Sequence, residues 1–158
     1  NQITMKSSEL NKIKILIVGP QNSGKSTMAN YIAEMEESNQ PKKGYHPTVA
    51  CRIVEFEKDA PRNPKRPGQE KVLVELWDIS GDPKYDRCWP AIQKNAQGCI
   101  LVYNAENPKH ENDMEGWLNA FPKKMGLQAN MCLALAHHPS GSIKGKSKPR
   151  KWEYIGYQ

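Results

Sequence analysis

One segment, Gly19 to Ser26, constrains the fold of this chain more than any other feature. Its sequence GPQNSGKS has the form G-x-x-x-x-G-K-[ST], and it stands between an apolar run, Ile13 to Val18, and an amphipathic stretch, Lys25 to Glu37. Glycines at both ends let the backbone curl, so that its N–H groups point inward at the positive end of a helix dipole. The pattern predicts a polyphosphate-binding loop that joins a buried strand to a helix.

Two side chains carry the chemistry of this loop. Lys25 offers a compact cation for the β- and γ-phosphates, and the Ser26 hydroxyl is placed to coordinate Mg²⁺. A glycine-rich turn with an exposed lysine is the other interpretation, but the strand before the loop and the helix after it favour phosphate binding. The residues expected to contact a nucleotide here are Gly19, Gln21, Asn22, Ser23, Gly24, Lys25, Ser26 and Thr27.

Further along the chain, Asp78 follows the apolar run from Val72 to Trp77. A carboxylate at that strand end is suited to hold a Mg²⁺ water, and Gly81 can bring its backbone N–H to a γ-phosphate. Taken alone, this D-x-x-G pattern also suits a turn that ends a strand. Thr48, in the segment YHPT, can swing its hydroxyl onto the metal, or it can simply start a strand.

Short apolar runs alternate with longer mixed segments, which is typical of strand–helix–strand units around a parallel sheet. Helical spacing of apolar residues predicts helices over Lys25 to Glu37 and Asn112 to Met125. Three prolines between Asp59 and Gln69 exclude regular structure there and predict an enlarged hairpin loop. The predicted strands are Ile13–Val18, Arg52–Phe56, Val72–Trp77, Cys99–Tyr103 and Met131–Ala136. We therefore expect an α/β fold with a mostly parallel sheet and helices on both faces.

The two ends of the chain differ from this core region. Residues 1–11 are polar and read as a flexible segment without a secretory signal, which favours a cytoplasmic protein. Residues 12–138 form the predicted domain. Residues 139–158 are rich in Ser, Gly, Pro and Lys, and read as a flexible basic tail or an incomplete end of the domain. The helix that would cover the last part of the sheet is absent from the sequence.

The chain carries a formal net charge of +6, and two segments, 58–71 and 142–158, hold the excess of positive charge. Both have the composition of solvated loops, and neither alternates aromatic with cationic residues as a nucleic-acid stacking surface does. We expect no nucleic-acid partner, although contact of these loops with an acidic protein, a membrane or a nucleic acid is the alternative. No apolar run approaches the roughly 20 residues of a bilayer-spanning helix.

Several motifs together resemble the small Ras-like GTPases, and within them the family of Rab-like small GTPase subunits of the intraflagellar transport B complex. The resemblance covers residues 12–141 and implies a Ras-like P-loop domain that binds GTP or GDP with Mg²⁺. It also implies docking on the coiled-coil subunits of that complex, in the cytoplasm and the cilium or flagellum. The motifs are G-P-x-x-S-G-K, Y-x-P-T, E-L-W-D-x-x-G-D, C-W-P-A-I at 88–92, V-Y-N-A at 102–105 and A-H-H-P-S-G at 136–141.

Two departures from the Ras-like pattern bear on function. The glutamine that usually follows D-x-x-G is replaced by Asp82, whose carboxylate repels a γ-phosphate, so intrinsic hydrolysis should be very slow. The usual Asn-Lys-x-Asp at the fifth strand is replaced by LAHH at 135–138, so guanine selectivity rests on the resemblance and adenine stays open. His137 and His138 are candidates to contact the base, or form an ordinary loop. No C-terminal cysteine motif for a prenyl anchor is present, so no membrane anchor is expected.

The leading hypothesis is a nucleotide-binding adaptor in which Ser26, Thr48 and Asp78 organise Mg²⁺ and Gly81 senses the γ-phosphate. The partner surface is expected on loops 38–50 and 79–92, with Trp89 either as its anchor or as a core residue. One alternative is a GTPase switch that a partner stimulates by supplying an arginine. Another is a small P-loop kinase, although no lid with catalytic arginines is evident.

Overall fold

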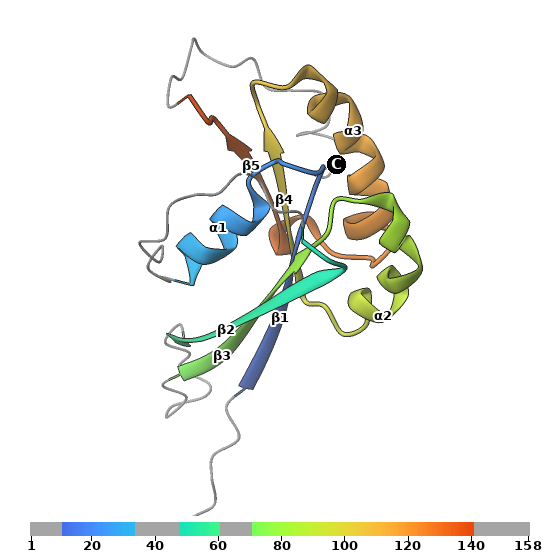
Figure 1. The fold of residues 1–158 in the computed structure, drawn as a ribbon. Coiled ribbons are helices and arrows are strands. Elements are labelled where there is room, and N and C mark those ends of the chain that lie inside the picture. Colours follow the sequence, from blue (N-terminus) through green and yellow to red (C-terminus); the bar gives the residue numbers. More distant parts are fainter. Residues whose placement is uncertain (1–10, 34–47, 61–70, 141–158) are drawn as a thin grey trace, which may run out of the picture.

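The computed structural model describes residues 11–33, 48–60 and 71–140 (Figure 1). Five strands form one sheet in the order β2-β3-β1-β4-β5. Helix α1 covers one face of this sheet, and α2 and α3 cover the other (Figure 1). The expected α/β fold is confirmed. The strands are β1 (Asn11–Val18), β2 (Cys51–Asp59), β3 (Lys71–Ile79), β4 (Gly98–Asn104) and β5 (Cys132–His137), and the helices are α1 (Lys25–Ile32), α2 (Trp89–Gln93) and α3 (Pro108–Leu118).

Four of the five strands run parallel, and this places their carboxyl ends along one edge. β1 pairs in parallel with both β3 and β4, and β4 pairs in parallel with β5. The loops that follow β1, β3, β4 and β5 therefore meet at the same edge of the sheet, which is where ligands bind in open α/β sheets. Two segments that carry predicted site residues, the loop after Val18 and the turn after Ile79, are neighbours for this reason.

β2 is the antiparallel member of the sheet. Its nine residues pair with β3 from Cys51 opposite Ile79 to Asp59 opposite Lys71. The predicted hairpin is thus confirmed, and both strands are longer than the sequence indicated. The proline-containing connection itself, residues 61–70, lies outside the described residues.

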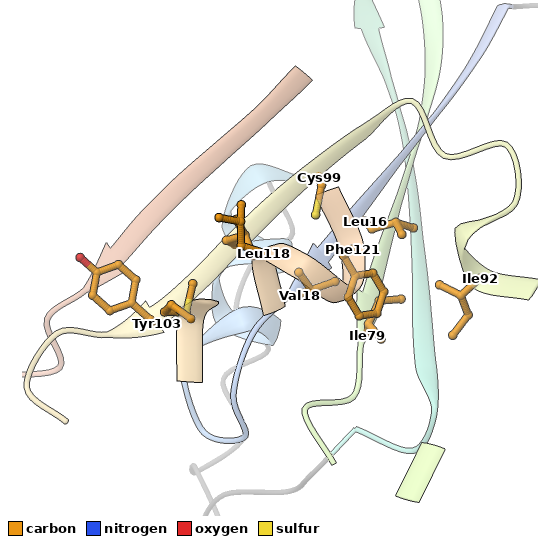
Figure 2. Close-up of a cluster of buried hydrophobic side chains, with 10 residues drawn as sticks. Leu16, Val18, Ile79, Ile92, Cys99, Tyr103, Leu118 and Phe121 are labelled. Atoms are coloured by element: carbon orange, nitrogen blue, oxygen red, sulfur yellow. The ribbon is translucent and has the colours of Figure 1, made fainter. Parts of the chain in front are cut away.

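The two faces of the sheet have separate apolar cores. On the α1 face, Ile17, Leu76 and Val102 pack with Ala29 of the helix. On the other face, Phe121 is fully buried among Val18, Ile79 and Leu118 (Figure 2). Because the central strands are buried on both faces, β1 and β4 read as continuous apolar runs in the sequence.

The helix boundaries differ from the sequence prediction. Helix α1 ends at Ile32, and residues 34–37 of the predicted helix lie outside the described residues. Helix α3 starts at Pro108, four residues before the predicted start, because the Asn107 side chain caps it by accepting a hydrogen bond from the Lys109 N–H at 3.0 Å. It ends at Leu118, and a single π-helical turn over Asn119–Lys123 contains Pro122.

The segment after β3 was predicted as a loop over 79–92, and that prediction is wrong for most of its length. Ile79 belongs to β3, Pro83–Cys88 forms a 3₁₀ turn, and α2 continues from Trp89 to Gln93. The short pieces show too little helical periodicity to be recognised from apolar spacing. Within the described ranges, no helix has the length and apolar character needed to cross a bilayer.

Candidate functional site

The loop between β1 and α1 has the backbone that the glycines predict. Gly19 and Gly24 have φ values of +146° and +95°, and Asn22 between them is also left-handed, at +56°. A Cβ added to Gly19 would lie 2.0 Å from the carbonyl oxygen of Val102 in β4. The loop is therefore pressed against a neighbouring strand end, and Gly19 is required both by its φ and by this close approach.

Lys25 lies at the first position of α1 and is buried. Its Nζ donates a hydrogen bond of 2.6 Å to the carbonyl oxygen of Pro20, so the side chain folds back over the loop. Burial lowers the pKa of Lys25 to about 8, and the nearby Asp78 carboxylate acts in the opposite direction. A buried ammonium above a loop of inward N–H groups is complementary to a polyanion.

Three oxygen-bearing side chains converge beside the loop, as the sequence predicted. Ser26 Oγ donates to Asp78 Oδ2 at 2.6 Å and lies 3.2 Å from Thr48 Oγ1. Asp78 is fully buried, and its Oδ1 has no hydrogen-bond partner among the described residues. Burial raises the pKa of Asp78, against the hydrogen bond from Ser26 and nearby positive charge.

These donors fit a magnesium ion. Hydroxyl and carboxylate oxygens are the hard ligands that Mg²⁺ prefers, and it usually keeps several waters with only one or two carboxylates. The unpartnered Asp78 Oδ1 is the kind of buried acceptor that such an ion or its water would satisfy. Within 11–33, 48–60 and 71–140 no cluster of three His, Cys, Asp or Glu side chains forms an alternative metal site.

The turn after β3 touches the phosphate loop directly. A Cβ on Gly81 would lie 2.4 Å from the Gln21 backbone nitrogen, so only glycine allows this approach. Asp82 next to it caps the 3₁₀ turn: its Oδ1 accepts from the Lys84 N–H at 3.0 Å, and its Oδ2 pairs with Lys84 Nζ at 3.3 Å. These contacts with Lys84 hold the pKa of Asp82 below its usual range.

The end of β5 also reaches the phosphate loop. His137 Nδ1 lies 3.2 Å from the Ser23 carbonyl oxygen, and a Cβ on Gly24 would come within 2.4 Å of the same nitrogen. The imidazole thus packs against the entry to α1, and contact with a base stays a prediction for His137 and His138. Of the other predicted contacts, Ser23 is buried, whereas Gln21, Asn22 and Thr27 are exposed.

Two residues of the site were missed by sequence reasoning. Arg52 of β2 reaches the Ser26 and Asp78 region across the sheet face. His110 of α3 is buried; its Nδ1 accepts from the Asn104 N–H at 3.1 Å, and its other nitrogen donates to the Gln21 backbone. Neither lies in a recognisable motif, and only the antiparallel register of β2 and the capping of α3 by Asn107 bring them to the loop.

Trp89 is half-buried and packs in an aromatic cluster. Its ring centroid lies 4.9 Å from that of Phe121 and 5.5 Å from that of Trp117. The cluster borders a cavity of about 730 Å³ between the phosphate loop, the turn after β3 and α3. A Trp89 substitution would therefore disturb packing on α3 as well as any interface.

Comparison with protein families and curated proteins gives consistent matches. Residues 14–138 match the model described as Ras of Complex, Roc, domain of DAPkinase. The chain is 42% identical over 139 residues to intraflagellar transport protein 22 homolog of Bos taurus, covering 87% of this chain and 71% of that protein. The Homo sapiens homolog is 42% identical over 132 residues, with coverages of 83% and 68%.

Solved structures from Trypanosoma brucei share the fold. A GTP-bound crystal structure of T. brucei IFT22/74/81 gives a TM-score of 0.69 at 31% identity, covering 90% of this chain and 78% of that one. A GDP-bound crystal structure of T. brucei IFT22 gives 0.63 at 27% identity, with coverages of 92% and 79%.

Gly19→Ala tests the close approach between the phosphate loop and β4. The added Cβ would overlap the Val102 carbonyl at a φ that L side chains rarely adopt. We expect a loss of about 2 kcal/mol or more in the free energy of unfolding, measured by chemical denaturation. Gly116→Ala in α3 is the matched control: its Cβ would meet nothing within 4 Å. The control should be neutral or stabilising by up to about 1 kcal/mol, and equal losses in both variants would contradict the argument.

His110 predicts a pH dependence of stability. Burial lowers its pKa from the ordinary 6.5, against the opposing effect of Asp113. The unfolded chain therefore takes up a proton before the folded one, so stability is full above about pH 6.5 and falls as the pH drops below it. His110→Asn keeps an acceptor for the Asn104 N–H but does not titrate there. Its melting temperature should fall less between about pH 7 and about pH 5, and parallel profiles would refute the assignment.

Proposed function

Since the chain belongs to the intraflagellar transport protein 22 family of Ras-like small GTPases, we propose that it binds GTP and GDP as an adaptor on a coiled-coil partner. The observation that carries this proposal is the convergence of Ser26, Thr48 and Asp78 beside a glycine-shaped loop with a buried lysine. The solved relatives of the family are described as GTP-bound and GDP-bound. Their titles support guanine over adenine as the base bound by this chain.

In the proposed complex each element of the site has one task. The backbone N–H groups from Gly19 to Ser26 hold the phosphates, and Lys25 releases the Pro20 carbonyl to pair with them. Ser26, Thr48 and Asp78 hold Mg²⁺, which neutralises phosphate charge when bound. Gly81, already against the loop, is placed to report the γ-phosphate to the 3₁₀ turn that follows it.

Nucleotide binding is tested by identifying what copurifies with the protein and by removing the buried cation. Mass spectrometry of freshly isolated, denatured protein should find GDP or GTP. Lys25→Ala should weaken guanine-nucleotide binding by roughly 2 kcal/mol or more, about thirtyfold, in a fluorescence titration. Lys71→Ala is the control, because Lys71 is exposed and pairs with Glu57 at only 3.4 Å. A copurified adenine nucleotide, or equal affinities of the two variants, would reject the proposal.

Slow hydrolysis follows from the position of Asp82. Its carboxylate is ionised and tied to Lys84, so it neither orients water as a glutamine does nor leaves the phosphate region neutral. We expect Asp82→Gln to raise single-turnover GTP hydrolysis by about tenfold or more, and Asp86→Asn on the same turn to leave it unchanged. Rapid phosphate release on adding the partner to the unaltered protein would instead favour the partner-stimulated GTPase.

The docking surface is proposed on β2 and the residues just before it. Val49 is 72% exposed and Ile53 46% exposed, at the outer edge of the sheet and next to Thr48 of the metal cradle. Exposed apolar side chains beside a nucleotide-sensing segment suit a partner that buries them. The partner is a coiled-coil pair equivalent to the 74 and 81 subunits named with the T. brucei relative.

Val49→Asp and Ile53→Asp test this surface. Each should weaken binding to the coiled-coil pair by about tenfold or more in calorimetry, because a charge replaces a buried apolar contact. Leu133→Asp is the matched control, since Leu133 is 50% exposed on β5 at the opposite edge of the sheet. Docking elsewhere would appear as unchanged affinity in both β2 variants.

A further inference from the structure

Arg52 joins three elements of the nucleotide site through one nitrogen. Its Nη2 donates to Asn30 Oδ1 at 2.8 Å and to the Ser26 carbonyl at 3.3 Å, and both acceptors are on α1. The same nitrogen lies 3.5 Å from Asp78 Oδ2 on β3. A single side chain from β2 therefore connects α1 to the carboxylate of the metal cradle.

The sheet register fixes this arrangement. Arg52 and Asp78 are directly opposite each other in the antiparallel pairing of β2 and β3. Directly opposed residues present their side chains on the same face, so the pair forms wherever the hairpin forms. The contact is thus built into the fold and does not depend on a chosen rotamer of a surface side chain.

The charges in the cradle are already compensated without a metal. Asp78 Oδ2 receives both the Ser26 hydroxyl and the Arg52 guanidinium, while its buried Oδ1 has no partner among the described residues. Arg52 itself keeps 40% of its side-chain surface exposed, so it is not a fully desolvated ion. A fixed cation beside a metal-side carboxylate supplies part of the attraction that a divalent ion would otherwise gain.

We propose that Arg52 is a resident cation of the metal cradle: it holds Asp78 and α1 in their binding arrangement and makes nucleotide binding less dependent on Mg²⁺. The inference rests on the proposed nucleotide function. Its role is positioning, because Arg52 acts through Asp78 and Ser26. A cradle made of Ser26, Thr48 and Asp78 alone would carry an uncompensated buried carboxylate until a metal ion arrived.

The test measures the Mg²⁺ dependence of affinity. A fluorescent GDP analogue is titrated into the full chain with saturating Mg²⁺ and with excess chelator, and the two dissociation constants are compared as a ratio. Arg52→Gln keeps hydrogen-bonding capacity but removes the charge, and should increase this ratio about tenfold. Arg87→Gln is the matched control, because Arg87 is exposed on the 3₁₀ turn and its loss changes net charge equally. The control should leave the ratio unchanged.

The outcomes separate this inference from the proposed function. If the unaltered protein binds no guanine nucleotide under either condition, the proposed function fails. If it binds, and Arg52→Gln leaves the ratio unchanged or changes it only as much as Arg87→Gln, the role of Arg52 is overturned while nucleotide binding stands.

Melting of the nucleotide-free protein in chelator supplies a second readout. Arg52→Gln should lower the melting temperature, and adding Asp78→Asn should restore part of the loss, because both charges are then removed together. Simple additivity of the two losses would count against charge pairing. If Arg52→Gln alone does not fold, recovery of folding in the double variant supports the pairing, and no recovery refutes it.

Discussion

Close backbone contact around the phosphate loop is the constraint on which the rest of the structure depends. Gly19 lies against the end of β4, Gly81 against the loop itself, and Gly24 against His137 at the end of β5. Because three strand ends meet one loop, the loop cannot change conformation without moving the sheet edge. The same contacts place Lys25, Ser26 and Asp78 within reach of one another, so the architecture of the sheet and the chemistry of the site are a single arrangement.

The sequence predicted the sheet well because its strands are buried on both faces. Ile13–Val18 and Cys99–Tyr103 are continuous apolar runs, which only central strands of this kind require. Helix α3 was placed four residues late, because its start is set by the Asn107 cap and not by apolar spacing. The helical turns from Pro83 to Gln93 were read as loop, since pieces of five or six residues show too little periodicity.

The predicted site divides in the same way. Ser26, Thr48 and Asp78 were identified because each belongs to a local motif whose residue types the metal chemistry dictates. Arg52 and His110 could not be found, since their roles depend on contacts 22 to 26 residues apart in one case and on the capped start of α3 in the other. The tasks of His137, His138 and Asp82 beyond their protein contacts depend on atoms that a single chain does not contain.

The hairpin of β2 and β3 also limits how the neighbouring segment can rearrange. Side chains alternate between faces along a strand, so sliding β2 by one residue would send Arg52 to the opposite side of the sheet. Ala50, just before β2, has φ +53°, and its carbonyl accepts from the Ser80 N–H at 2.8 Å. Swivelling of Thr48 is therefore confined to the two residues preceding this latch, and the strand beyond it works as a rigid beam.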